Sequence, residues 1–164
     1  MNVVIDTNIL IAANGHSEQV DGLAQLACIN FLEAIKTQNG RVSVDAFNLI
    51  FEEYKTYCHH SGQPGTGDAF FKWLYLNQGY AEVCENVQIT LDDERVFVEF
   101  PNDVNLVDFD RSDRKFVAVA LASRFNPTIY NATDSDWKIF NRLLAVHGVR
   151  IHQLCPELLD CDEL

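Results

Sequence analysis

No stretch of this 164-residue sequence is long and apolar enough to span a membrane as a helix. The apolar runs all fall well short of the roughly 20 residues that a spanning helix needs. The first residues also lack the basic segment, the apolar core and the cleavage site of a secretory signal. We therefore expect a cytoplasmic protein without a membrane partner.

Paired cysteines are also missing. The five cysteines are an odd number at irregular spacing, and no CxxC motif is present, which argues against a disulfide framework. We expect reduced thiols, some of them buried as small hydrophobic side chains. The run Cys58-His59-His60 invites comparison with a zinc site, but no second ligand pair lies at a standard zinc spacing. A solvated helix end entering a loop is the favoured interpretation of that run.

Positive charge is scarce, with 12 lysine and arginine residues against 24 acidic ones and a net charge of −12. Nonspecific nucleic-acid binding normally depends on lysine and arginine side chains that neutralise phosphates. An acidic protein can still act on nucleic acid where its basic residues are clustered and metal ions offset its acids. The candidates for contact with substrate phosphate are Arg114, Lys115 and Lys138, and scattered, solvated surface charge is the alternative interpretation.

Two familiar catalytic motifs are absent. The glycine-rich segment 61–67 contains no GxxxxGK[ST] phosphate loop. Ser43 and Ser135 lack the GxSxG context of an activated serine, and no histidine is placed to act with a serine or a cysteine. Carboxylates are therefore the side chains left to carry chemistry.

What the sequence does contain is a regular alternation of strand and helix patterns. The predicted elements are strands at 2–6, 41–44, 128–131 and 149–152, and helices at about 9–13, 21–37, 46–57, 70–77, 116–123 and 135–147. This order predicts right-handed crossovers, a parallel sheet and an α/β fold. A chain of this length suits a single domain spanning 1–164.

The middle of the chain is its least regular part. The segment 61–67 predicts a flexible connection, and Asp68 is placed to cap the helix that follows it. Two alternating stretches, 87–91 and 95–100, flank a short acidic loop and indicate a hairpin. An insertion around 61–104 at the edge of the sheet is the other interpretation.

Acidic residues stand at the ends of several predicted elements. Asp6 closes the first strand, Asp113 opens a strongly apolar helix, and Asp134 and Asp136 follow a later strand. Because parallel strands present ligand sites at their carboxyl ends, these acids are candidates for one crevice. Asp6 could instead simply cap the helix that follows it.

Carboxylates gathered in one crevice repel each other, and a divalent cation is the usual reason for tolerating them. Oxygen ligands alone select hard ions such as Mg²⁺ or Mn²⁺. Such an ion can lower the pKa of a bound water and neutralise a leaving oxygen. The predicted chemistry is metal-assisted hydrolysis of a phosphate ester, most simply an endonucleolytic cut.

Four segments carry a resemblance to a known family. They are VIDTNIL at the start, Ile50-Phe-Glu-Glu-Tyr54, Asp110-Arg-Ser-Asp-Arg-Lys-Phe-Val-Ala-Val-Ala120 and Asn131-Ala-Thr-Asp-Ser-Asp136. In this order they resemble the PIN domain family of metal-dependent ribonucleases. The resemblance implies a three-layer α/β/α sandwich around a central parallel sheet, and it implies an RNA substrate.

The resemblance also implies a site that holds Mg²⁺ or Mn²⁺. Its catalytic residues and metal ligands would be Asp6, Glu53, Asp113 and Asp134. Asp136 would ligate a second ion or hold a bound water. Supporting contacts would come from Thr7, Asn8 and Thr133. Because Glu52 and Glu53 point about 100° apart on a helix, only one of them can face the crevice, and Glu52 is the reserve.

Other members of the resembled family suggest partners and alternatives. Many of them are toxins silenced by an antitoxin protein, and dimers are common, so an antitoxin partner and a homodimer are both compatible with the resemblance. A catalytically silent PIN-like binding or scaffold module in RNA metabolism is the alternative function. A haloacid dehalogenase-like phosphatase also opens with a strand-end acid, but its mechanism needs a second acid two residues later, where this chain has Asn8.

Overall fold

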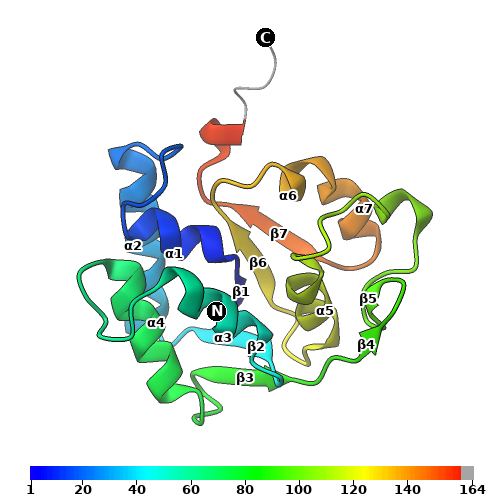
Figure 1. Ribbon diagram of the computed structural model, residues 1–164, viewed down its shortest axis with the longest axis horizontal. Helices are drawn as coiled ribbons and strands as arrows, with labels where there is room; N and C mark the ends of the chain where they lie inside the picture. The colour runs from blue at the N-terminus through cyan, green and yellow to red at the C-terminus, as the bar shows by residue number, and fades with distance from the viewer. Residues whose placement is uncertain (160–164) are drawn as a thin grey trace.

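Five parallel strands form the central sheet of the computed structural model, which describes residues 1–159 (Figure 1). Their bounds are β1 Asn2–Ile5, β2 Arg41–Asp45, β3 Cys84–Val87, β6 Thr128–Asn131 and β7 Arg150–Gln153. The spatial order is β3-β2-β1-β6-β7, and every neighbouring pair is parallel. The expected α/β fold with a parallel sheet is confirmed.

The two halves of the sheet extend from β1 in opposite directions. β1 pairs with β2 on one side, where Val3 lies opposite Val42, and with β6 on the other, where Val4 lies opposite Ile129. The chain first builds β2 and β3 outward and then returns to build β6 and β7. Open α/β sheets bind ligands beyond the carboxyl ends of the strands at such a reversal. Here the reversal lies between β1 and β6.

Helices cover the sheet in two groups (Figure 1). The helices are α1 Thr7–Ala13, α2 Gly22–Thr37, α3 Leu49–Tyr57, α4 Thr66–Asn77, α5 Arg114–Ala122, α6 Asp136–Ile139 and α7 Asn141–Val146, with 3₁₀ turns at Val104–Leu106 and Pro156–Leu159. α1, α2 and α4 pack against one another, whereas α5 lies against β1, β2 and β6, and α7 lies against β7. Together with the sheet they form the expected three-layer α/β/α sandwich. In the described part of the chain, no helix is long and apolar enough to cross a membrane.

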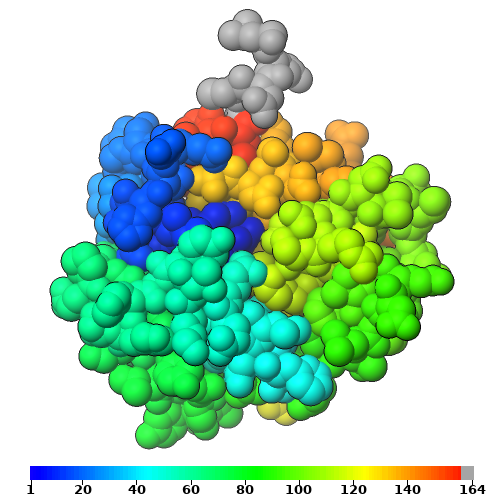
Figure 2. Space-filling view, viewed as in Figure 1, coloured from blue at the N-terminus to red at the C-terminus, as the bar shows by residue number. Residues whose placement is uncertain are grey.

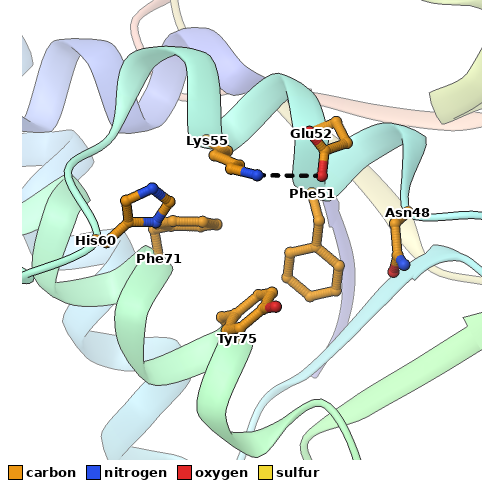
Figure 3. Close-up of a pocket in the computed structure, with 7 residues that line it drawn as sticks. All are labelled: Asn48, Phe51, Glu52, Lys55, His60, Phe71 and Tyr75. Atoms are coloured by element: carbon orange, nitrogen blue, oxygen red, sulfur yellow. Dashed lines mark ion pairs between the residues drawn. The ribbon is translucent and has the colours of Figure 1, made fainter.

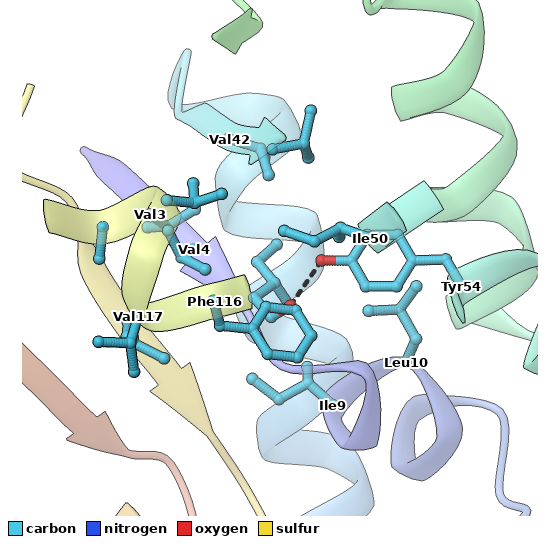
Figure 4. Packing of buried hydrophobic residues seen from close by; sticks show 14 of the residues in the cluster. Val3, Val4, Ile9, Leu10, Val42, Ile50, Tyr54, Phe116 and Val117 are labelled. Carbon is cyan, nitrogen blue, oxygen red and sulfur yellow. Dashed lines mark hydrogen bonds between the residues drawn. The ribbon is translucent and has the colours of Figure 1, made fainter. Parts of the chain in front are cut away.

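The core is built around β1, whose three apolar residues are completely buried. Because parallel strands are covered on both faces, they contain continuous apolar runs rather than alternating ones. Side chains of α1, α3 and α5 close around the strand, among them Ile9, Ile50 and Phe116 (Figure 4). The hydroxyl of Tyr54 donates to the carbonyl of Ile5, 2.5 Å away. This bond satisfies a buried hydroxyl and fixes α3 against the end of β1.

Three helices depart clearly from their predictions. The helix expected at 70–77 begins at Thr66, with Gly65 as its N-cap. Asp68, the expected cap of this helix, lies in its first turn and accepts the N–H of Gly65 at 2.9 Å.

The helix expected at 46–57 begins at Leu49, because Asp45 caps it across a short turn. Both carboxylate oxygens of Asp45 accept backbone N–H groups, at distances of 2.8 to 3.0 Å. The helix expected at 135–147 divides at Phe140 into α6 and α7.

Much of the segment 61–104 is joined to the sandwich rather than set apart from it. β3 extends the sheet alongside β2, and α4 packs on α1. The expected hairpin is shorter than its sequence pattern suggests: only two residue pairs join β4 Leu91–Asp92 to β5 Val96–Phe97. This hairpin and the loops beside it lie next to the main sheet (Figure 1).

The cysteines of the described residues are free and buried, as their irregular spacing predicts. They are Cys28, Cys58, Cys84 and Cys155, and Cys161 lies outside the described residues. Burial raises the pKa of the Cys58 and Cys84 thiols to about 12. These thiols therefore stay protonated and act as small hydrophobic side chains.

Candidate metal centre

Asp6 lies where β1 ends and α1 begins, and it is almost completely buried. One carboxylate oxygen accepts the backbone N–H of Asn8 at 3.2 Å, so that Asp6 caps α1. The other oxygen accepts the indole N–H of Trp137 at 2.5 Å. The sequence offered two roles for Asp6, as a helix cap and as an acid at the strand end. The structure shows that one carboxylate has both positions.

Two further acids reach the same point. Asp113 directly precedes α5, and Asp134 lies in the turn between β6 and α6. Asp6, Asp113 and Asp134, which we call the acid cluster, each offer one oxygen, and these oxygens lie within 4.8 Å of one another. In the space-filling view, the blue N-terminal segment meets the yellow-green and yellow segments on one face of the molecule (Figure 2). The structure thus brings together three of the acids that the sequence singled out.

A pair of amide side chains holds the turn that carries Asp134. Asn8 donates to the side-chain oxygen of Asn131 at 2.7 Å and accepts the N–H of Ala132 at 2.9 Å. Asn131 is fully buried at the end of β6, and its side chain also accepts the N–H of Asp134 at 3.1 Å. Asn8 therefore contacts Asp6 through its backbone and supports the Asp134 turn through its side chain.

Glu53 faces the acid cluster, and Glu52 does not. The hydroxyl of Thr7 donates to Glu53, and the ammonium of Lys115 forms an ion pair with the same carboxylate. Glu52 keeps 68% of its side chain exposed and pairs with Lys55 at 3.6 Å. This placement favours Glu53 over Glu52 as the glutamate of the site. Glu53 stands beside the acid cluster rather than within it, and Lys115 offsets its charge.

Arg114 is buried, which corrects its expected role in substrate binding. Its guanidinium donates to backbone carbonyls of the loop before α5, including those of Leu106 at 3.2 Å and Val107 at 2.9 Å. The same group lies over the ring of Phe100, 4.4 Å from its centroid. Because the guanidinium is buried and bonded to these carbonyls, it stabilises the loop and is not placed to contact RNA phosphate.

Lys115 and Lys138, the other two candidates for phosphate contact, also interact with the protein itself. Lys115 is buried, and besides pairing with Glu53 it donates to the carbonyl of Ser112. Lys138 donates to the carbonyl of Leu159 at 2.9 Å. Of the three candidates, Lys115 is the one that pairs with Glu53, the glutamate beside the acid cluster.

Asp136 and Thr133 flank Asp134. The N–H of Asp136 donates to the Asp134 carboxylate at 2.9 Å, so Asp136 helps to hold that acid through its backbone. Burial raises the pKa of Asp136, and the charge of Asp134 adds to the effect. Thr133 is half-buried in the same turn. A second ion at Asp136 and a supporting role for Thr133 stay predictions.

Burial and the charges of neighbouring acids raise the pKa of two members of the acid cluster, Asp6 and Asp113. For Asp6 the largest cause is burial, the charges of Asp134 and Glu53 add to it, and the hydrogen bonds that Asp6 accepts act in the opposite direction. For Asp113 burial is again the largest cause, followed by the charges of Asp6 and Asp134. In the absence of a cation, Asp6 and Asp113 therefore hold protons above the usual pH range of carboxyl groups.

The donor set of the acid cluster fits a hard divalent cation. Three carboxylates offer one oxygen each to a common centre, and oxygen ligands suit Mg²⁺ and Mn²⁺. A cation there would displace protons and relieve the repulsion among buried acids. Within residues 1–159, the run Cys58-His59-His60 forms no comparable group of ligands.

A hollow lies between α3 and α4, away from the acid cluster (Figure 3). Its walls are the rings of Phe51, Phe71 and Tyr75, and polar side chains stand around them. The carboxylate that lines it belongs to Glu52 and is paired with Lys55. This hollow lacks a set of oxygen ligands for a cation, so the acid cluster is the better candidate for a functional site.

Asn131 and Trp137 are contributors to the site that the sequence did not single out. A buried amide at the end of a strand, next to an acidic turn, was a usable signal for Asn131. Trp137 offered no local signal, because its place on an apolar stripe is typical of a core residue. Its hydrogen-bond partner Asp6 is 131 residues away in the sequence.

The site is assembled from the end of β1, from α3, from the start of α5 and from the turn after β6. No family model matches the chain, and no curated protein and no solved structure matches it either.

Proposed function

We propose that this protein is a Mg²⁺- or Mn²⁺-dependent endoribonuclease of the PIN type. The observation that carries the proposal is the convergence of Asp6, Asp113 and Asp134 within 4.8 Å from three distant parts of the chain. Buried acids at this spacing destabilise a protein unless something neutralises them. A hard cation that also engages a phosphodiester is the ligand that these oxygen donors support best.

The position of the acid cluster supports the same function. Asp6 follows β1 and Asn131 ends β6, the two strands between which the order of the sheet reverses. Ligands of open α/β sheets bind at this kind of position. A site for substrate is therefore expected where the acids meet.

Each group in the site has a distinct task. The acid cluster would hold the cation, which when bound supplies a water of lowered pKa and neutralises charge on the leaving oxygen. Lys115 places a positive charge beside Glu53. The amide pair of Asn8 and Asn131 keeps the turn with Asp134 in position.

Cleavage of a labelled single-stranded RNA in the presence of Mn²⁺ tests this proposal. We expect the wild type to cut the RNA and EDTA to stop the reaction. Asp6→Asn and Asp113→Asn should each lower the rate at least about 100-fold, because a lost ligand costs more than a lost outer partner. Both variants should stay folded in thermal unfolding, since asparagine keeps the shape and relieves repulsion. Asp113→Asn is the simpler of the two, because Asp6 accepts an N–H on each oxygen and asparagine has a single acceptor oxygen.

Asp93→Asn is the matched control, because Asp93 is an exposed acid in the β4–β5 turn. This variant should cut RNA at the wild-type rate. If Asp6→Asn and Asp113→Asn cut as fast as Asp93→Asn, the proposed function is wrong. If the wild type neither binds Mn²⁺ nor cuts RNA, a catalytically silent module with the same fold is the better explanation.

A further inference from the structure

A buried tryptophan donates its indole N–H to one acid of the cluster. Trp137 is completely buried in α6, and its Nε1 lies 2.5 Å from Oδ2 of Asp6. An indole nitrogen can only donate, and a buried one usually has a partner. Here the partner is a carboxylate, and hydrogen bonds to charged groups are about twice as strong as those between neutral groups.

Aromatic neighbours hold the indole ring in place. The ring of Trp137 packs edge to face with Phe109, at a centroid distance of 5.2 Å, and with Phe116, at 6.5 Å. Phe109 is itself held by an edge contact with Phe140 at 5.5 Å. Because close packing fixes the plane of the indole, its N–H has a fixed direction. The core thus sets the direction from which Asp6 receives its hydrogen bond.

Trp137 also belongs to the turn that supplies another acid of the cluster. Asp134 lies just before α6, and its carboxylate accepts the N–H of Asp136 at 2.9 Å. The stretch 134–137 therefore presents one candidate ligand and the donor to a second. The bond from Trp137 to Asp6 joins this turn to the end of β1.

We propose that Trp137 is a positioning residue that fixes the carboxylate of Asp6 for cation binding. This inference rests on the proposed function. Asp6 accepts the N–H of Asn8 on one oxygen and the indole N–H on the other, so each oxygen keeps a further lone pair. With both oxygens anchored, the carboxylate cannot rotate freely, and its remaining lone pairs keep one orientation relative to Asp113 and Asp134.

A positioning role and a packing role predict different results. Outer partners that orient a metal ligand typically contribute a factor of about 10 to 100 in metal affinity. A tryptophan that only filled the core would contribute to stability without a specific effect on affinity. The substitution Trp137→Phe separates the two roles, because it retains an aromatic ring and removes the N–H.

The nuclear magnetic resonance signal of the indole N–H tests the hydrogen bond itself. The chain has two tryptophans, so Trp73→Phe leaves Trp137 as the single indole signal of a ¹⁵N-labelled protein. We expect this proton to resonate downfield and to exchange slowly with water. Asp6→Ala should move it upfield, and titration with Mg²⁺ should shift it. A signal that responds to neither Asp6→Ala nor Mg²⁺ would overturn the inference.

Mn²⁺ affinity, measured by titration calorimetry, tests the role of the bond in the site. We expect Trp137→Phe to bind Mn²⁺ about 10- to 100-fold more weakly than the wild type. Phe109→Leu is the matched control, because it loosens the same aromatic cluster and leaves the indole N–H in place. This control should lose thermal stability to a similar extent and keep an affinity close to that of the wild type.

The two variants also separate this inference from the proposed function. Wild-type affinity in Trp137→Phe would overturn the positioning role and leave the proposed function intact. An equal loss of affinity in Trp137→Phe and Phe109→Leu would overturn it as well, because packing alone would then explain both. A wild type that binds no Mn²⁺ would overturn the proposed function and this inference together.

Discussion

At the scale of a residue, the burial of the Asp113 carboxylate beside other acids destabilises the folded protein. Asp113 keeps 8% of its surface exposed and lies close to two other acids, so its ionised form lacks both water and a nearby neutralising charge. Its place at the start of α5 offsets part of this cost, because helix N-termini favour negative charge. A proton or a cation can relieve the remainder.

In the cation-free protein, the free energy of unfolding should decrease as the pH rises. Burial and neighbouring acids raise the pKa of Asp113 and Asp6 in the folded state. The folded protein therefore retains protons that the unfolded chain loses near its usual carboxyl pKa of about 4. We expect a decrease of about 1–3 kcal/mol from about pH 5 to about pH 8, measured by urea unfolding in EDTA.

Asp113→Asn provides the comparison for this pH dependence. The variant has no proton to lose at that position, so its unfolding free energy should exceed that of the wild type at about pH 8 and depend less on pH. The exposed Asp93→Asn substitution should leave the pH dependence of the wild type unchanged. A wild type that becomes more stable over the same pH range would contradict the raised pKa values.

The residues of the site differ in how far the sequence revealed them. Asp6, Asp113 and Asp134 could be predicted as neighbours, because each adjoins a strongly patterned element and topology brings those ends together. The burial of Arg114 could not be predicted. An arginine before an apolar helix resembles a surface charge, and its burial depends on how the loop 95–109 folds over it.

At the scale of elements, the close packing of α4 against α1 holds in place the helix that Asp6 caps. Asp68, in the first turn of α4, accepts the side-chain N–H of Asn14 at 3.1 Å. A Cβ atom at Gly67 would lie 2.2 Å from the carbonyl oxygen of Leu10, so only glycine permits this approach. Because Asp6 caps α1, displacement of that helix would disturb the acid cluster.

Gly67→Ala should therefore destabilise the fold. We expect a loss of about 1–3 kcal/mol in the free energy of unfolding, because α4 must move away from α1 to make room. Gly79→Ala is the control, since nothing lies within 4 Å of a Cβ atom built there, and it should change stability by no more than about 0.5 kcal/mol. Urea unfolding measures both variants, and equal effects would show that the helices do not constrain this position.

The bounds of the elements depended partly on contacts that the sequence does not display. The start of α2 could be predicted, because Asp21 precedes a regular apolar stripe, and its side chain accepts a backbone N–H at 2.9 Å. α3 starts later than its pattern suggests because Asn48 adopts a left-handed conformation, with φ of 64°, in the turn held by Asp45. The break at Phe140 accompanies its contact with Phe109, which is remote in sequence.

At the scale of the whole molecule, the net charge of −12 opposes contact with RNA unless positive charge is supplied locally. The basic residues that the sequence offered for this task contact the protein itself, through backbone carbonyls for Arg114 and Lys138 and through Glu53 for Lys115. A divalent cation at the acid cluster would lower the negative charge where a phosphate must approach. Cation binding and RNA binding are therefore coupled in the proposed function.

The fold could be predicted at this scale because its signals are regular. Continuous apolar strands that alternate with amphipathic helices leave few arrangements besides a parallel sheet covered on both faces. The hairpin of β4 and β5 could not be given its true extent, because alternation continues beyond the two residue pairs that join its strands. The strand β3 was not predicted, and it forms by parallel pairing with β2 at the edge of the main sheet.

Binding of Mn²⁺, measured by electron paramagnetic resonance, tests most directly whether the three acids hold one cation. Free Mn²⁺ gives a sharp signal that is lost on binding, so a titration reports affinity without RNA. We predict binding to the wild type and to Asp93→Asn, and affinity lower by at least about 100-fold in Asp6→Asn, Asp113→Asn and Asp134→Asn. Binding that survives all three substitutions unchanged, or a wild type that leaves the Mn²⁺ signal untouched, would contradict the existence of this metal centre.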